Sequence, residues 1–319
     1  MKKQLFFFLM LMGCFFWVTS LYAQHDNLTN VSADFMRMGG RTAALDAADI
    51  AVYNPAGLVH LDDGLHINVA NQFIFRSPTH SFAFPIPGFD TEKEYTQDSP
   101  DLLLPNIYLA YKRSNYSLYG GFYISGGGGS SDYPEGSINS DLIILQLMDP
   151  GATSSILGSS FYMTPFIGLS YGITEKLSAA VSFKYILATN KQEAYINTSP
   201  GVELGLESTD KASGIGFTAS LDYRASENFN IAARYETKSS LEFETEVMRD
   251  DFGLLVDGDL NNRDLPAAAS LGANFNITDN LSGMVEGSWY FQKGADWETA
   301  PTGAEWSEVA GDAARFALG

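Results

Sequence analysis

The feature that most constrains the fold is an alternation of side-chain type that runs without interruption over residues 229–247. Its odd positions carry no charge and include Phe229, Ile231, Tyr235 and Leu241. Successive side chains of a β-strand point to opposite faces, so the pattern predicts one long strand with a neutral face and a charged face. The charged even positions are Arg234, Glu236, Lys238, Glu242, Glu244 and Glu246.

The same period of two recurs along the chain, and a repeated hairpin connects many of the segments that show it. Tyr171, Tyr223 and Phe275 begin three similar stretches, 52 residues apart, in which a short polar turn leads to an apolar residue. We therefore predict about nine to ten strands in all. They are 65–75, 106–113, 116–125, 161–171, 177–195, 214–223, 229–247, 267–276 and 281–293, with a tenth that begins at 315.

Short turns alternate strictly with long loops along this series. The short turns are 114–115, 172–176, 224–228 and 277–280, and the long loops are 76–105, 126–160, 196–213, 248–266 and 294–314. This asymmetry is typical of outer-membrane barrels. A secreted β-sandwich also alternates apolar and polar faces, but its strands are usually only about 5–6 residues long.

Aromatic residues gather beside the short turns, as an interfacial girdle requires; Tyr111 and Tyr116 are examples. We therefore predict an all-β protein, a transmembrane antiparallel β-barrel with several passes through the outer membrane. In the strand 229–247, the odd positions are expected to face lipid and the even positions the lumen.

The first residues predict secretion. Lys2 and Lys3 precede an apolar run, 5–18, and a cleavage site follows Ala23, so residues 1–23 are interpreted as a signal peptide. A lipoprotein cleavage box around Cys14 is the alternative, and it would leave an apolar mature N-terminus. Cys14 is the only cysteine, so the body can hold no disulfide framework and no thiolate nucleophile.

Charge and histidine placement exclude other functions. The formal net charge of −19 argues against nucleic acid, because phosphate neutralisation needs clustered Lys and Arg. The four histidines, His25, His60, His66 and His80, all lie near the N-terminus, so neither a catalytic Ser–His pair nor a His metal cluster is indicated. We predict no catalytic residue, no metal and no cofactor. An outer-membrane lipid hydrolase stays open as an alternative.

Residues 24–64 precede the first strand and do not alternate. They contain the stretch Gly40-Arg-Thr-Ala-Ala44 with Asp46, and then Asn54-Pro-Ala-Gly-Leu58. This pattern resembles the N-terminal hatch, or plug, of the FadL/TodX family of outer-membrane transporters of hydrophobic compounds. The resemblance continues at Tyr235-Glu-Thr-Lys238 and over 265–273 and 279–282, and it spans residues 24–319.

The resemblance implies a monomeric barrel of fourteen strands, residues 65–319 here, that is closed by the plug. It implies passive passage of long-chain fatty acids or other hydrophobic molecules across the outer membrane, and it places Arg41, Asn54, Pro55 and Ala56 in the hatch. Because nine complete strands and the beginning of a tenth fall short of fourteen, we expect about four strands to be missing at the C-terminal end. A general porin for polar solutes is the nearest alternative.

Several side chains are candidates for handling such a substrate. The loop stretch 140–148 predicts a short amphipathic helix whose apolar residues suit an outer capture groove or else pack against the barrel rim; they are Leu142, Ile143, Leu145 and Leu147. In this family the third strand is kinked, and adjacent glycines weaken strand pairing. Gly120 and Gly121 are therefore predicted to mark a lateral gap in the wall, or else a close contact with the plug.

Three cations fall on the charged face and are candidates for binding an acidic head group: Lys184, Arg234 and Lys238. The alternative is that they pair with a lumenal acid such as Glu236. Fatty acids, aromatic hydrocarbons and signalling lipids all fit as the hydrophobic substrate.

Overall fold

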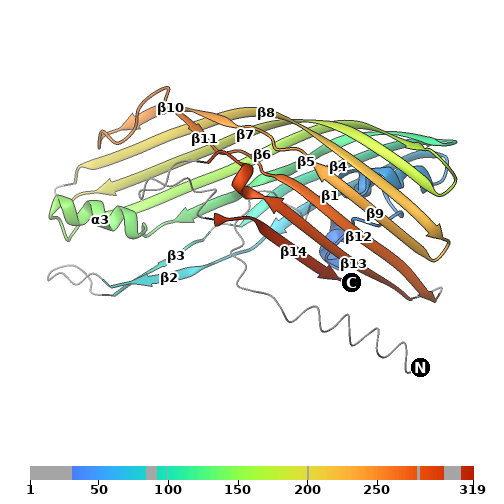
Figure 1. Cartoon of the computed structure of the whole chain (residues 1–319). Coiled ribbons are helices and arrows are strands. Elements are labelled where there is room, and N and C mark those ends of the chain that lie inside the picture. Colours follow the sequence, from blue (N-terminus) through green and yellow to red (C-terminus); the bar gives the residue numbers. More distant parts are fainter. Residues whose placement is uncertain (1–30, 84–91, 99, 200, 279–280, 298–309) are drawn as a thin grey trace.

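The computed structural model describes residues 31–83, 92–98, 100–199, 201–278, 281–297 and 310–319; the predicted signal peptide lies outside them. Most of the described chain forms one curved antiparallel sheet that wraps around residues 31–63 (Figure 1). The predicted all-β antiparallel architecture is confirmed. In sheet order the strands are β1 (Gly64–Ile74), β4 (Asp101–Arg113), β5 (Tyr116–Tyr133), β6 (Thr153–Gly172), β7 (Leu177–Asn197), β8 (Glu203–Ser226), β9 (Phe229–Glu236), β12 (Ala267–Thr278), β13 (Leu281–Phe291) and β14 (Ala313–Leu318).

Smaller strands stand beside this main path. β10 (Glu242–Asp250) pairs with the far part of β8 and with β11 (Leu260–Asn262), while β2 (Thr79–Phe82) and β3 (Lys93–Thr96) form a separate hairpin. β1 and β14 are the two edges of the main path in the described part of the chain. Strands β4 to β8 extend further than expected toward the long loops, as β8 does compared with the predicted 214–223, whereas β9 and β13 end before the predicted 247 and 293.

The outer face of the sheet is apolar, as lipid contact requires. On β7, Val181, Phe183, Tyr185 and Leu187 are exposed, while the residues between them are buried on the inner face. Contiguous exposed apolar surface of this extent is rare on soluble monomers and is typical of membrane contact. Within the described residues, no helix combines the length and the apolar character needed to cross a membrane.

The predicted strand 229–247 is in fact two strands, and this corrects the assignment of its faces. Through β9 the even positions are buried and the odd positions turn outward, as expected. Between β9 and β10 the chain leaves the ladder, and afterwards Leu241 and Phe243 are buried while Glu242 and Glu244 are exposed. The sequence alternation continues, but the faces are exchanged. Lys238 therefore does not lie on the lumenal face.

The segment before β1 lies within the curve of the sheet, near the end that carries the short turns (Figure 1). It comprises α2 (Ala33–Met38) and two short 3-10 helices, η1 (Ala48–Val52) and η2 (Pro55–His60). The Ser32 side chain caps α2 by accepting from Phe35 N, and Gly39 ends the helix with a left-handed φ of 75°. We call residues 31–63 the plug. Its apolar side chains share one buried cluster with Tyr108, Tyr119 and Phe166 of the wall.

Candidate functional site

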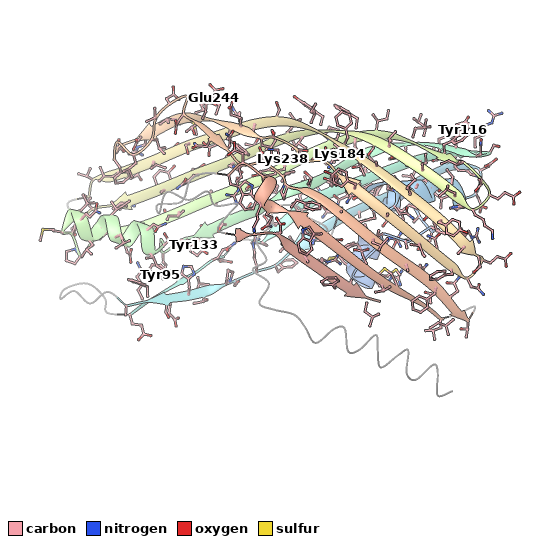
Figure 2. All side chains as sticks on the ribbon, in the orientation of Figure 1. Tyr95, Tyr116, Tyr133, Lys184, Lys238 and Glu244 are labelled. Carbon is pink, nitrogen blue, oxygen red and sulfur yellow. The ribbon has the colours of Figure 1, made fainter. Side chains whose placement is uncertain are left out.

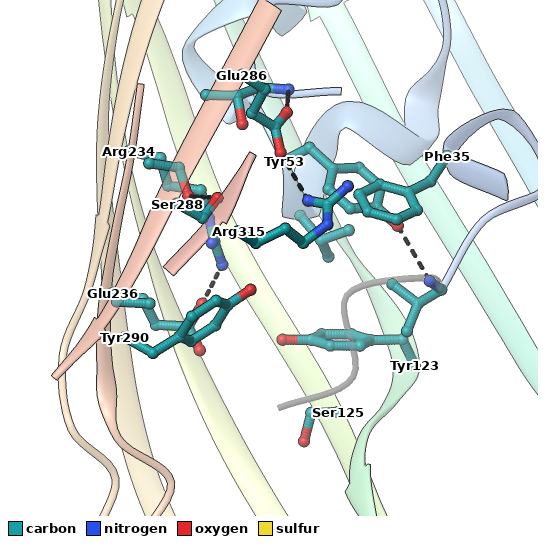
Figure 3. Close-up of a pocket in the computed structure, with 15 residues that line it drawn as sticks. Phe35, Tyr53, Tyr123, Ser125, Arg234, Glu236, Glu286, Ser288, Tyr290 and Arg315 are labelled. Atoms are coloured by element: carbon teal, nitrogen blue, oxygen red, sulfur yellow. Dashed lines mark hydrogen bonds and ion pairs between the residues drawn. The ribbon is translucent and has the colours of Figure 1, made fainter. Parts of the chain in front are cut away.

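A small internal cavity of about 50 Å³ lies between the plug and the wall (Figure 3). One side is aromatic and aliphatic, and the other side carries charged and hydroxyl groups. Figure 3 shows the rings of Phe35, Tyr53, Tyr123 and Tyr290 around the same space. The lining residues are Val31, Phe35, Thr42, Val52, Tyr53, Tyr123, Ser125, Arg234, Glu236, Ala268, Ser270, Glu286, Ser288, Tyr290 and Arg315.

Two cations share one carboxylate at the wall of this cavity. Lys184 on β7 and Arg234 on β9 both pair with Glu236, and all three side chains are largely buried. The predicted alternative for Lys184 and Arg234, pairing with Glu236, is therefore what the structure contains. The group still has one positive charge more than it has negative charges, and Arg234 Nε has no hydrogen-bond partner. A buried cation of this kind favours an anionic group of a ligand.

A second charged pair attaches the plug to the wall beside the cavity. Glu286 on β13 accepts from the backbone N–H groups of Arg41 (2.9 Å) and Thr42 (2.7 Å), and from Arg315 Nη1 at 3.0 Å. The Arg315 guanidinium lies over the Phe35 ring, 4.6 Å from its centroid, and donates to the Gly39 carbonyl. The plug is thus attached to β13 and β14 through one carboxylate and one guanidinium.

The hatch residue Arg41 is fully buried and holds the plug's own fold together. Its guanidinium binds Asp46 at 2.7 Å and Asp49 at 2.7 Å. Burial alone would lower the pKa of Arg41, but the hydrogen bonds and charges of the two aspartates raise it. Arg41 is therefore an internal support of the plug, and its side chain is occupied by these two acids.

The other hatch residues, Asn54, Pro55 and Ala56, bind short polar side chains of the wall. Ser170 on β6 donates to the Pro55 carbonyl at 2.6 Å, and Ser178 on β7 donates to the Ala56 carbonyl at 2.7 Å. Ala56 N donates to Ser220 Oγ on β8 at 2.9 Å. These bonds run to β6, β7 and β8, so this turn fixes the plug to the part of the wall beyond β5.

The ladder between β4 and β5 is interrupted halfway along the wall. Their last registered pair is Ile107 with Phe122, after which β5 stays with β6 through two register shifts between Ile124 and Gly129. Across the interruption Ile124 N donates a long hydrogen bond of 3.4 Å to Asn106 Oδ1. We call this interval, residues 104–106 of β4 and 123–126 of β5, the window.

The far end of the window is closed by charged and polar groups. Asp101 Oδ1 accepts from Ser130 N at 2.7 Å, and its Oδ2 accepts from Arg76 at 2.8 Å. Arg76 also donates to the Ser130 carbonyl at 2.6 Å. β4 and β5 therefore separate over a short interval and are joined again beyond it.

Gly120 and Gly121, the predicted lateral gap, lie in regular pairing on both sides. Leu109 and Ile167 flank Gly120, and Tyr108 and Phe166 flank Gly121. A Cβ at Gly121 would collide with the Ile107 carbonyl and approach the Phe166 ring. The interruption of the wall therefore begins two residues beyond Gly121, at Tyr123, and these glycines allow strands and an aromatic ring to approach closely.

The helix predicted in this loop is present as α3 (Ile138–Leu147), but its apolar residues are spread around it and do not form the predicted amphipathic face. Leu142 and Leu147 are exposed, Ile143 and Leu145 are half-buried, and Ile144 packs inward. The β2–β3 hairpin, which the sequence analysis did not predict, is joined to α3 through Asp141.

Asp141 accepts from Lys93 Nζ (3.1 Å) and Tyr95 Oη (2.7 Å). His80 stacks on Tyr95 and meets the edge of Tyr133, and Figure 2 labels both tyrosines at the loop end of the molecule.

One segment has the sequence pattern of a hydrolase nucleophile and was not identified from the sequence. Residues 168–172 read Gly-Leu-Ser-Tyr-Gly, the letters of a nucleophile elbow. An elbow needs a sharp strand-to-helix turn, whereas Ser170 lies inside the regular strand β6 with its hydroxyl donated to Pro55. Among the described residues, no group of three or more His, Cys, Asp and Glu is placed to hold a metal ion.

A plug enclosed by a curved antiparallel sheet is the arrangement of the FadL type of β-barrel fold. Solved structures with this fold are similar over most of the chain. The toluene transporter TbuX of Ralstonia pickettii matches with a TM-score of 0.58 and 15% identity, over 93% of this chain and 79% of its own.

The Pseudomonas putida toluene transporter TodX gives a TM-score of 0.57 and 14% identity, over 86% of this chain and 72% of its own. A FadL homologue of Pseudomonas aeruginosa gives a TM-score of 0.59 and 13% identity, over 85% of this chain and 70% of its own. At these identities the likeness is one of fold. Comparison of the sequence with family models found no match, and comparison with curated proteins found none either.

Proposed function

We propose that this protein is an outer-membrane transporter that lets hydrophobic molecules cross passively and leave sideways through the window between β4 and β5. The observation that carries the proposal is that Tyr123 and Ser125 belong to both features. They line the internal cavity, and they lie in the part of β5 that has left β4. A molecule in the cavity is therefore next to the interrupted part of the wall.

The surroundings of the cavity support sideways exit over straight passage. The periplasmic side of the plug opens into a polar hollow that carries Asn230, Asn274, Asn276 and Arg224. An apolar molecule loses its favourable burial on entering such a space. The window instead opens through a wall whose outer face is apolar, so the molecule would pass from protein to lipid without crossing water.

The charged group in the cavity supports a substrate with an acidic head, such as a long-chain fatty acid. The surplus cation and the free Arg234 Nε–H suit a carboxylate, while Phe35, Tyr53 and Tyr123 suit an acyl chain. The cavity is smaller than the roughly 150 Å³ that holds benzene in an engineered apolar core. Binding would therefore require the plug side chains to move. Leu142, Ile143, Leu145 and Leu147 on α3 would offer the first contact outside.

Filling the window tests the proposed exit. Asn106→Phe places a ring between the separated strands, and uptake of a labelled fatty acid into proteoliposomes should fall severalfold. Leu103→Phe is the matched control, because Leu103 lies on the same strand but is exposed on the outer face. Heat-modifiable gel migration verifies that both variants are folded, and Asn106→Ala, which widens the window, should not slow uptake. Unchanged uptake in a folded Asn106→Phe variant would exclude this exit.

Liposome swelling distinguishes transport from a general pore. The plug closes the interior around the small cavity, so sugars should not enter the vesicles at a rate above that of protein-free controls. Rapid sugar entry would instead support the porin alternative. Arg234→Gln should weaken binding of dodecanoate more than binding of toluene, and equal effects on the two would argue against a carboxylate site.

A further inference from the structure

The interruption between β9 and β10 leaves a hollow of about 580 Å³ on the outer face of the wall. The last registered pair of β8 with β9 joins Thr218 to Glu236, and pairing with β10 resumes only at Lys211 and Glu244. In the interval a Cβ at Gly214 would collide with the Ser240 carbonyl, so the wall stays covered there by a close backbone approach. The hollow is lined by Tyr185, Ser213, Gly214, Ile215, Phe217, Thr237, Lys238 and Ser240.

The floor of the hollow is apolar and belongs to the lipid-facing surface. Tyr185, Ile215 and Phe217 are each about half exposed, and all three occupy the outward-facing positions of β7 and β8. Tyr185 is directly opposite Ile215 in the ladder. An aromatic and aliphatic floor of this kind suits a hydrocarbon chain lying along the wall.

Lys238 stands at the rim of the hollow because the faces are exchanged after β9. Its side chain is 40% exposed, and its ammonium pairs with Asp264 Oδ2 at 2.6 Å. Asp264 is nearly fully buried and also accepts from the backbone N–H groups of Leu241 and Asp296, both at 3.0 Å. An ammonium has three N–H donors. Asp264 fixes the position of the lysine, and the bond to its one oxygen leaves further ammonium N–H donors for a ligand.

The height of Lys238 on the wall coincides with the edge of the apolar band. On β8 the outward positions are apolar from Tyr223 to Ile215, and the next two outward residues are Ser213 and Lys211. A membrane-spanning strand needs about 9–11 residues, so the band ends where lipid headgroups begin. A lysine is expensive at the bilayer midplane and nearly free of cost at this level.

We propose that the hollow is a binding site for one membrane lipid, with an acyl chain on the Tyr185–Ile215–Phe217 floor and an anionic phosphate headgroup on Lys238. The complementary charges and the level of the band edge select this occupant. The site rests on the membrane placement proposed above, but it is independent of what is transported. It lies on the outside of the wall, and the internal cavity has no part in it.

Native mass spectrometry of the full chain, released from nanodiscs of equal parts phosphatidylglycerol and phosphatidylcholine, tests the proposal. One retained lipid should be phosphatidylglycerol with about fivefold preference, which corresponds to the ~1 kcal/mol that one lysine contributes near an anionic lipid surface. Lys238→Gln should abolish the preference. Lys211→Gln is the matched control, because Lys211 is also exposed and paired, with Glu246, but lies outside the hollow.

A second variant keeps the charge and removes the space. Ser213→Trp should fill the hollow and reduce the retained lipid, while Lys238→Arg should keep it. Equal retention of both lipids by the wild type, or an unchanged preference in Lys238→Gln, overturns the proposal. Failure of the wild type to enter bilayers, seen by flotation, would reject the membrane placement itself. Displacement of the lipid by inorganic phosphate alone would show that the hollow contributes nothing.

Discussion

The side-chain amide of Asn54 in the plug donates to the carboxylate of Asp222 on β8 over 2.7 Å, and so joins residues 168 positions apart. Asn230 on β9 donates to the same oxygen at 2.8 Å, and it also donates to the Ala43 carbonyl of the plug. His60 Nε2 lies 3.4 Å from the other carboxylate oxygen. One buried carboxylate thus gathers three side chains from the plug and the wall.

Removal of this carboxylate should loosen the plug and leave the wall intact. Asp222→Ala strips the acceptor from two buried amides, and each unsatisfied donor costs about 1–3 kcal/mol. We expect easier denaturant-induced exposure of the plug and higher ion conductance in planar bilayers. Glu227→Gln, an exposed change in the adjacent turn, should leave both unchanged. Wild-type conductance in Asp222→Ala would show that Asp222 is not needed to hold the plug.

The exchange of faces between β9 and β10 gives opposite expectations for neighbouring sites. Leu241→Ala should cost about 2–5 kcal/mol, because Leu241 is fully buried against Tyr162 and Phe243. The control Leu221→Ala removes an exposed side chain from the lipid face and should cost much less. Urea titration of the protein in liposomes measures both. Equal costs would favour uninterrupted alternation over the whole of 229–247.

A charge on the outer face of β9 should be costly where the band is deepest. Ala233→Arg places a cation between Leu221 and Leu271 of the adjacent strands and should cost up to about 2–4 kcal/mol. Ser240→Arg also points outward, but at the rim, and should cost roughly 0–1 kcal/mol. Urea titration in liposomes measures the loss of unfolding free energy in both variants. An equal loss at both positions would contradict the placement of Ser240 at the edge of the apolar band.

Glu236 should be indispensable to the interior, because it is the shared partner of Lys184 and Arg234. Glu236→Ala leaves two buried cations without that partner and should cost about 3–5 kcal/mol. Added acetate, which can enter the vacated position, should recover part of this stability, whereas chloride at equal ionic strength should recover less. Absence of any acetate effect would argue against an accessible carboxylate site.

The loop beyond α3 should be held by a contact that weakens in acid. Asp149 accepts hydrogen bonds from the Ser199 hydroxyl and from the Ser199 backbone N–H, the latter at 2.6 Å. These bonds, the hydroxyl's being the larger cause, hold the pKa of the Asp149 carboxyl below its ordinary value. A lowered folded pKa gives stability that is fully present above the unfolded pKa and is lost as pH falls through the folded one. The Ser199 amide resonance should therefore shift only as the pH falls below the ordinary pKa of an aspartate. In Asp149→Asn this titration should vanish.

The ends of the strands near the short turns could be predicted from the sequence, because a strand between lipid and the interior must alternate apolar and polar residues. Tyr171, Tyr223 and Phe275 each mark the point at which a strand reaches its turn. At the opposite end the strands continue into segments such as 203–213, in which apolar and polar residues are mixed without regular alternation. Without alternation the sequence gives no strand signal. The prediction therefore started this strand at 214, whereas β8 begins at Glu203.

The site was less predictable because it depends on contacts between distant strands. Lys184, Arg234 and Lys238 share one pattern in the sequence, and Lys184 and Arg234 do point inward, but the bend after Glu236 turns Lys238 outward. The prediction of a lateral gap at Gly120 and Gly121 rests on the family resemblance, which implies a kinked third strand, and on the two adjacent glycines. Whether a glycine marks a break or a close approach depends on its neighbour, here the Phe166 ring.

The plug is held by single hydrogen bonds to successive strands, and this has a mechanical consequence. Traction on the chain at Val31 would first load the bond between its own carbonyl and the Tyr108 hydroxyl on β4. The attachments of Gly39 to Arg315 and of Arg41 and Thr42 to Glu286 would be loaded next. The bonds of Pro55 and Ala56 to β6, β7 and β8 would be loaded last. Rupture would then proceed one strand at a time. Single-molecule pulling should record a staircase of small forces in place of one abrupt peak.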